Sequence, residues 1–147
     1  MSIEDLRAKT GCVLGISPWL TITQERIDAF ADTTLDRAAI HINPAAARAS
    51  PLGTTIAHGA LTLSLLAGLY QLACPWPAVR LSLNYGYDKV RFLAPVPVNA
   101  RIRGVFTQTA LAEKRPGAWL QTLATTVEIE GAARPALVAD WLVLHEP

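Results

Sequence analysis

A chain of 147 residues, 51% hydrophobic and 17% charged, is long enough to enclose one sizeable core. Its formal net charge is only +1 and no run of Lys or Arg exceeds two residues, which argues against a surface for nucleic acid or anionic membranes. No stretch approaches the ~20 apolar residues of a membrane span, residues 1–10 hold no apolar signal region, and the two cysteines form no CxxC pair. We therefore expect a cytoplasmic protein with reduced thiols.

Two helices with recognisable N-caps are predicted in the first half. Thr23 can cap a helix that continues to about residue 32, with an acidic residue in its first turn. Asn43 followed by Pro44 is typical of an N-cap with proline at the first helical position, and predicts a short helix over residues 45–49. The segment between them, residues 36–43, is expected to be a loop.

The most distinctive segment runs from Gly59 to Ala73 and is apolar nearly all round, with leucines at helical spacing. Such a helix would be roughly 22 Å long at 1.5 Å per residue. A helix that is apolar on every side is normally buried on every side, so we expect it at the centre of the fold.

Strand patterns fill the second half. In the third segment Leu123, Val127 and Ile129 alternate with polar residues, and Gly131 follows at a hairpin corner. The fourth is apolar on both faces and is expected inside the sheet. The segments predicted to be strands lie near residues 79–92, 98–110, 118–130 and 133–144. One domain over residues 1–147, of class α+β, with an antiparallel sheet wrapped around a long helix, is the resulting prediction.

Of the three histidines, His41 and His58 flank the predicted helix over residues 45–49, and His145 lies beside the C-terminus, where we expect it to be solvated. Asp36 precedes His41 by five positions, and a carboxylate near an imidazole can share a water and move a proton in both directions. That spacing alone also occurs by chance. Gly59 starts the apolar helix, where its amide could polarise a carbonyl or where it could simply allow close packing.

Other common types of site are not indicated. The sequence has no HxxxH, HExxH or Cys/His cluster for a metal, and no GxGxxG or Walker-type loop for a nucleotide. It has no GxSxG, and Ser64 sits in the apolar helix without an adjacent base. Neither a metal ion nor a cofactor is therefore expected.

Two stretches resemble a known family. LDRAAIHINPAAARASPLGTTIAHGALTLSLL is similar to the hydratase-2 signature of MaoC-like proteins, and LNYGYDKVRFLAPVPVNARIRG resembles the branch related to nodulation protein N. The resemblance implies a hot-dog fold and a homodimer with the two sheets joined edge to edge. It also implies a lyase that hydrates a trans-2-enoyl-CoA reversibly to a (3R)-3-hydroxyacyl-CoA without a metal or redox cofactor.

The same resemblance assigns roles to particular residues. It makes Asp36 and His41 the catalytic residues, and it implies that the amide of Gly59 binds the thioester oxygen of the acyl-CoA substrate. Asn84 and Tyr85 fall in the Asn-Tyr-Gly motif of the branch and are expected to border the substrate pocket.

Three departures from the family pattern leave alternatives open. Leu35 stands where the family usually has Gly, Ala67 where a serine is common, and Asn99 where the branch has a turn Gly. Asn tolerates a left-handed turn, so only the first two affect the expected site. A hot-dog thioesterase and a non-catalytic acyl-CoA-binding or partner subunit are the competing interpretations.

Overall fold

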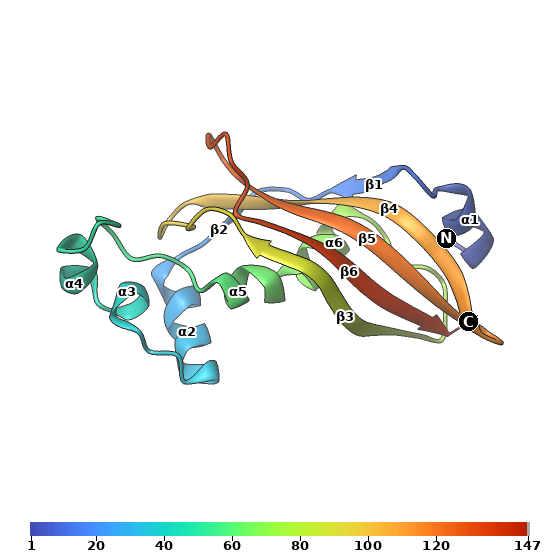
Figure 1. Cartoon of the computed structure of the whole chain (residues 1–147), viewed down its shortest axis with the longest axis horizontal. Coiled ribbons are helices and arrows are strands. Elements are labelled where there is room, and N and C mark those ends of the chain that lie inside the picture. Colours follow the sequence, from blue (N-terminus) through green and yellow to red (C-terminus); the bar gives the residue numbers. More distant parts are fainter. Residues whose placement is uncertain (147) are drawn as a thin grey trace.

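The computed structural model describes residues 1–146 as a curved antiparallel sheet with helices against one face and beyond one end (Figure 1). The strands are β1 (Val13–Ile16), β2 (Leu20–Thr21), β3 (Leu81–Phe92), β4 (Arg101–Arg115), β5 (Ala118–Ile129) and β6 (Leu137–Glu146). The helices are α1 (Ile3–Ala8), α2 (Gln24–Thr34), α3 (Ala39–Ile42), α4 (Pro44–Arg48), α5 (Gly59–Ser64) and α6 (Leu66–Ala73).

The sheet has the strand order β1-β4-β5-β6-β3, and the short β2 also pairs with β4. All four strands predicted in the second half are present, with ends shifted by at most five residues. β6 lies between β5 and β3, which confirms that the strand with two apolar faces is internal. β3 forms one end of the strand order, and the chain reaches it directly from α6.

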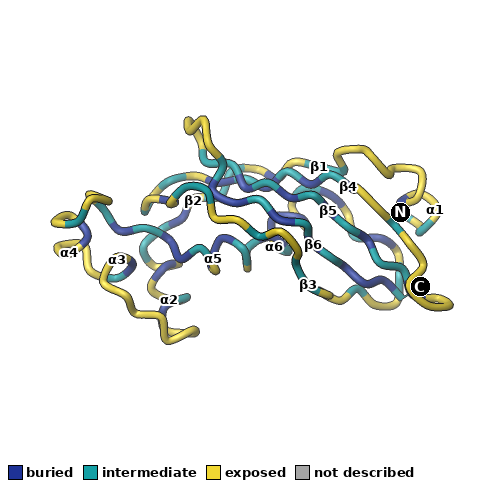
Figure 2. The backbone as a smooth tube through the Cα atoms, in the orientation of Figure 1, coloured by how far each residue is buried: buried dark blue, intermediate teal, exposed yellow. Residues whose placement is uncertain are grey.

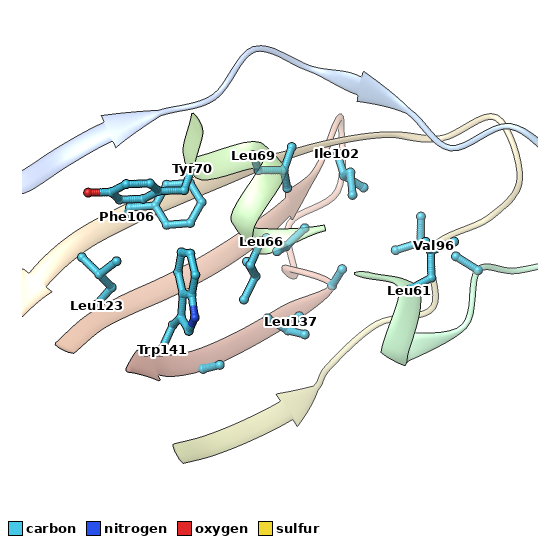
Figure 3. Close-up of a cluster of buried hydrophobic side chains, with 14 of the residues drawn as sticks. Leu61, Leu66, Leu69, Tyr70, Val96, Ile102, Phe106, Leu123, Leu137 and Trp141 are labelled. Carbon is cyan, nitrogen blue, oxygen red and sulfur yellow. The ribbon is translucent and has the colours of Figure 1, made fainter. Parts of the chain in front are cut away.

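The core lies between the sheet and the α5–α6 segment. Tyr70 from α6 meets the rings of Phe106 and Trp141 edge-on, with centroids 5.2 and 5.7 Å apart, and Leu66 and Leu69 pack beside it (Figure 3). In Figure 2 the buried positions alternate along the central strands, as the predicted period of two requires. A sheet wrapped around a helix in this way confirms the hot-dog fold.

The long apolar helix differs from the prediction in two respects. It is interrupted at Leu65, which separates α5 from α6. It is also not buried on every side, because the sheet covers only one of its faces. Leu72 is 59% exposed, and Ser64, Gly68 and Gln71 on the uncovered side are exposed as well.

The N-terminal half contains elements that the pattern did not indicate. α1 begins with a capping box between Ser2 and Asp5, β1 and β2 are too short to show an alternation, and α3 occupies part of the expected loop at residues 36–43. The predicted caps are confirmed: the Thr23 side chain accepts from Arg26 N–H, and Asn43 caps α4 with Pro44 at its first turn.

His145 is buried, so the expectation of a solvated side chain was wrong. It lies in β6 and points inward, with Nδ1 2.8 Å from the Ser82 hydroxyl and Nε2 3.0 Å from Gln121 Oε1. The strand continues to Glu146 and thus carries this residue into the interior. Burial lowers the pKa of His145 from 6.5 to about 4, because the charged imidazolium cannot be solvated there.

Two further expectations concern the chain as a whole. Within residues 1–146, no helix has both the length and the hydropathy needed to cross a bilayer. Cys12 is exposed and Cys74 is buried, and both are free thiols.

Candidate active site

The predicted catalytic residues meet where α2, α3 and the segment before α5 come together. Asp36 follows the C-terminal end of α2, His41 lies in α3, and Gly59 is the first residue of α5. Asp36, His41 and His58 offer side-chain atoms that all lie within 4.8 Å of one another. His41 and Gly59 line one cavity, so three of the five predicted site residues gather in this region.

His41 is held in one orientation. Its ring is only 7% exposed, and Nδ1 lies 2.7 Å from the carbonyl oxygen of Ile56. A carbonyl can only accept a hydrogen bond, so in this contact Nδ1 carries a proton, and in the neutral form of the ring Nε2 then holds the lone pair. The Gln24 side chain donates to the His41 carbonyl at 2.8 Å, which fixes the backbone as well. The free nitrogen of His41 is therefore the one able to accept a proton.

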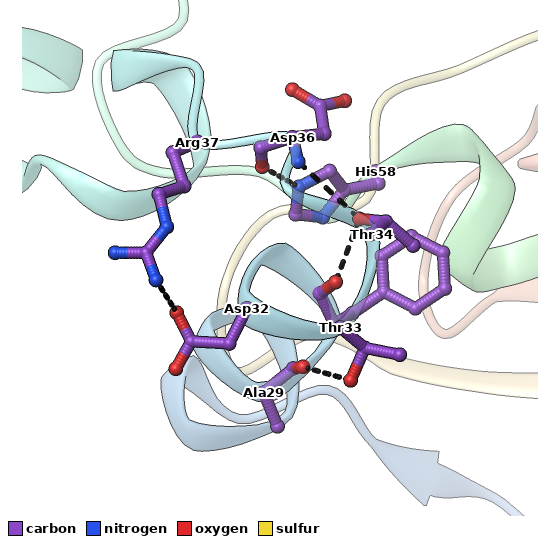
Figure 4. A network of polar contacts seen from close by, with 8 residues as sticks. Ala29, Asp32, Thr33, Thr34, Asp36, Arg37 and His58 are labelled. Atoms are coloured by element: carbon purple, nitrogen blue, oxygen red, sulfur yellow. Dashed lines mark hydrogen bonds and ion pairs between the residues drawn. The ribbon is translucent and has the colours of Figure 1, made fainter.

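Asp36 is placed by a left-handed turn at Leu35. Leu35 has φ 64° and is 80% exposed, so it adopts the backbone conformation that a glycine takes most easily. The departure from Gly at this position therefore leaves the turn in place at some cost in strain. One oxygen of the Asp36 carboxylate lies within 4.8 Å of a ring nitrogen of His58, and Oδ1 accepts weakly from Ala38 N–H at 3.4 Å (Figure 4 shows Asp36 beside His58).

His58, which the sequence interpretation did not assign to the site, touches both predicted catalytic residues. Its ring stacks on that of His41 with centroids 3.7 Å apart and planes at 25°. Its Nε2 lies 2.9 Å from the backbone oxygen of Asp36 (Figure 4). The signal that could have indicated it was the Ala-His-Gly motif, where His58 directly precedes Gly59.

The cluster of Asp36, His41 and His58 has the residue types of a metal site, but its geometry does not suit one. Imidazole coordinates through a lone pair in the ring plane, and two stacked rings direct these lone pairs along nearly parallel planes rather than toward one point. His41 Nδ1 and His58 Nε2 are also engaged with peptide oxygens. The arrangement therefore favours proton transfer over coordination.

The cavity beside His41 has a volume of about 220 Å³ and mostly apolar walls, to which Ile56, Ala57, Val96 and Ala136 contribute. Thr62, in the first turns of α5, adds a hydroxyl group that the sequence interpretation missed. A mostly apolar cavity with a few polar groups is typical of a site for a small molecule.

Gly59 is enclosed by an aromatic ring from the end of β3. A Cβ atom built on Gly59 would lie 2.9 Å from Cδ1 of Phe92, which also lines the cavity and is 54% exposed. A side chain at position 59 would thus displace this ring. The structure gives Gly59 both a place in the cavity wall and a packing reason to lack a side chain.

Asn84 and Tyr85 are not among the residues that line this cavity. The Asn84 side chain accepts from the indole N–H of Trp141 and donates to the Tyr87 hydroxyl, each at 3.0 Å. Tyr85 is 48% exposed and lies beneath the ammonium of Lys114. β3 meets the cavity only at Phe92, and at about 3.3 Å per residue Asn84 is on the order of 25 Å away along the strand.

Ser64 does not supply the hydroxyl missing at Ala67. Its Oγ donates to the Ala60 carbonyl within α5 at 2.8 Å, and the residue is exposed. Ala67 is packed against the core from α6. The only hydroxyl group among the cavity-lining residues comes from Thr62.

Comparison with known proteins places this chain in a family. The model of the MaoC like domain matches residues 6–132, which include Asp36, His41, His58 and Gly59. This chain belongs to the MaoC-like family. The MaoC-like chain is 46% identical over 144 residues to 3-hydroxyacyl-thioester dehydratase Z of Mycobacterium tuberculosis, covering 98% of this chain and 95% of that protein.

Two further relatives cover most of the MaoC-like chain. Nodulation protein N of Rhizobium leguminosarum bv. viciae is 42% identical, over 98% of this chain and 91% of its own length. The solved structure of an (R)-hydratase from A. caviae involved in PHA biosynthesis superposes with a TM-score of 0.74 at 26% identity, over 89% of this chain and 94% of that one. The resemblances that the sequence suggested are thereby confirmed for both family and fold.

Proposed function

We propose that this MaoC-like protein is a hydro-lyase that reversibly adds water to a trans-2-enoyl thioester, with a (3R)-3-hydroxyacyl thioester as the product. The observation that carries the proposal is the fixed orientation of His41, whose Nδ1 is held at the Ile56 carbonyl while the residue lines the cavity and lies close to the Asp36 side chain. The dehydratase and hydratase names of the relatives support the same reaction class.

The proposed chemistry needs a single water molecule. Asp36 and His41 hold it, and His41 Nε2 accepts one of its protons as the oxygen bonds to the β-carbon. The α-carbon then receives a proton through the same pair of side chains, so one water supplies both the hydroxyl group and the hydrogen. Run backward, these steps eliminate water from the 3-hydroxyacyl thioester.

Between those two proton transfers, negative charge accumulates on the thioester oxygen. The first amides of a helix have no acceptor within it and lie at the positive end of its dipole. We assign the Gly59 N–H to this oxygen because Gly59 lines the same cavity as His41. Amides positioned for an oxyanion in this way typically contribute about 10²–10³-fold in rate.

The proposed substrate is an acyl-CoA whose acyl chain occupies the apolar part of the cavity. Its volume of about 220 Å³ and its small wall residues, such as Ala57 and Ala136, accommodate a short chain within one subunit. That Asn84 and Tyr85 border the substrate pocket stays a prediction, because neither residue lines this cavity.

We also propose that the protein acts as a homodimer. β3 is the last strand of the sheet order, and Leu81, Leu83 and Tyr85 occupy alternate positions on one of its faces with 41–48% exposure. Exposed apolar residues on an edge strand require cover. Pairing of two β3 strands would extend the sheet across both subunits, and stable interfaces of this kind bury at least ~1,200 Å² in total.

The test is a panel of enoyl-CoA thioesters followed in parallel by loss of enoyl-thioester absorbance, by release of free thiol and by chiral analysis of the product. We expect absorbance loss without thiol release, and a 3R product. Thiol release without hydration would identify a thioesterase instead. Tight binding of these thioesters with neither reaction would indicate a non-catalytic binding subunit.

A further inference from the structure

We propose that His58 is the positioning residue of this site: it holds the Asp36 loop, the His41 ring and the Gly59 amide in one fixed arrangement. The inference rests on the proposed function, because it concerns the geometry of the same residues. It assigns no contact with substrate to His58, whose side chain is buried behind the ring of His41.

The first contact ties His58 to the Asp36 loop. His58 Nε2 lies 2.9 Å from the Asp36 carbonyl oxygen, which can only accept, so Nε2–H donates (Figure 4). Asp36 follows a residue in the left-handed conformation and is itself exposed. The hydrogen bond from His58 therefore anchors a peptide that solvent-exposed side chains alone would leave free to move.

The second contact orients His41. The two imidazole rings stack with centroids 3.7 Å apart, and Phe30 packs at 5.1 Å from the ring of His58. The ring of His58 therefore contacts both Phe30 and His41. Together with the hydrogen bond from His41 Nδ1 to Ile56, the stacking on His58 restricts rotation of the catalytic ring and keeps Nε2 directed to one place.

The third connection is covalent. His58 is the N-cap residue of α5, with φ −60° and ψ 137°, and its carbonyl accepts from Thr62 N–H at 3.2 Å. Its backbone conformation therefore sets the direction of the Gly59 N–H that follows it. A single residue consequently touches or precedes each of the three groups that the proposed mechanism uses.

A purely structural histidine is a poor explanation for this position. His58 is 2% exposed, and its Nδ1 has no hydrogen-bond partner within residues 1–146. A buried nitrogen without a partner is destabilising, so an apolar ring would fill the space at lower cost. The ring retains its nitrogens because Nε2–H is needed at the Asp36 carbonyl, and its planarity is needed against His41.

Two substitutions separate these contributions. His58→Phe keeps a flat ring against His41 but removes the donor to Asp36, and His58→Gln keeps a donor but removes the ring. Small displacements of catalytic groups cost up to about 10²-fold in rate, so we expect each variant to lower kcat about 10- to 100-fold while KM stays within about threefold. His145→Gln is the matched control, since it alters a buried histidine remote from the site and should leave kcat unchanged.

A second readout does not depend on turnover. With three histidines in the chain, ring ¹⁵N and ¹H signals can be assigned by comparing the single variants. We expect His41 of the wild type to show a proton on Nδ1 and none on Nε2. In both His58 variants we expect its signals to move toward those of a rotating ring with mixed tautomers.

The outcomes distinguish this inference from the function on which it rests. If folded His58→Phe and His58→Gln keep both wild-type kcat and wild-type His41 signals, His58 does not position the site and the proposed hydratase function stands. If the wild type hydrates no enoyl thioester, that function fails. In that case the NMR signals of His41 test the positioning role of His58 by themselves. A mobile His41 ring in the two variants supports the role, and an unchanged His41 ring contradicts it.

Discussion

The burial of His145 predicts a specific dependence of stability on pH. The pKa of this residue is 6.5 in the unfolded chain and about 4 in the fold. Because the folded value is the lower one, the stabilisation is complete above pH 6.5 and is lost as the pH falls toward 4. The full difference of about 2.5 pH units corresponds to about 3 kcal/mol, of which about 2 kcal/mol is lost between pH 7 and pH 5.

The assay is urea unfolding of the wild type and of His145→Gln at a series of pH values from 7 to 5. Gln cannot be protonated, so the variant should be less stable at pH 7 yet lose about 2 kcal/mol less than the wild type over this interval. Carboxylates and the other histidines are common to both proteins and cancel in the comparison. Parallel stability curves for the two proteins would refute the assignment of His145 as a buried neutral group.

The turn at Leu35, the contact at Gly59 and the edge of the sheet can each be tested by substitution or by the size of the protein in solution. Leu35→Gly should raise the free energy of unfolding by about 0.5–1 kcal/mol, because a left-handed backbone strains a residue with a Cβ; chemical denaturation would show no gain if that strain were absent. Phe92→Ala removes the ring that a side chain at position 59 would meet. Adding Gly59→Ala to Phe92→Ala should still lower kcat/KM relative to Phe92→Ala alone. If the double variant has the same kcat/KM as Phe92→Ala, Gly59 has a packing role only. Sedimentation at micromolar concentration should give about twice the chain mass of 15.8 kDa, and Leu83→Lys should shift the protein toward monomer; a wild type that sediments as a monomer would rule out the dimer.

The parts of the fold that could be predicted are those with a repeating pattern. The alternation around Leu123 and Val127 and the apolar segment from Gly59 to Ala73 are sufficient to indicate a sheet around a helix, because burial on one face repeats with the period of the element. α1 and β1 are too short for any period to emerge. The exposure of Leu72 depends on which face of the helix the sheet covers. The sequence of a helix that is apolar on all sides does not indicate that face.

The candidate site could be predicted where its residues belong to one short sequence motif. Asp36, His41 and Gly59 belong to one motif, and the structure brings them into the same region. His58 belongs to that motif too, but its stacking on His41 depends on the path of residues 42–57 and not on spacing. His145 was misjudged because closeness to the C-terminus suggested solvent, whereas the register of β6 turns its side chain inward.

The central claim is that Asp36 and His41 act as one unit on one water, and the direct measurement is a double-variant cycle on an enoyl-CoA that the wild type hydrates well. A positioned acid or base typically contributes about 10²–10⁴-fold, so folded Asp36→Asn and His41→Gln should each lose activity on that order. Since both hold the same water, the double variant should lose much less than the product of the two single losses. Near wild-type turnover in either folded single variant would contradict the claim, and so would fully multiplicative losses, which belong to two residues that act independently.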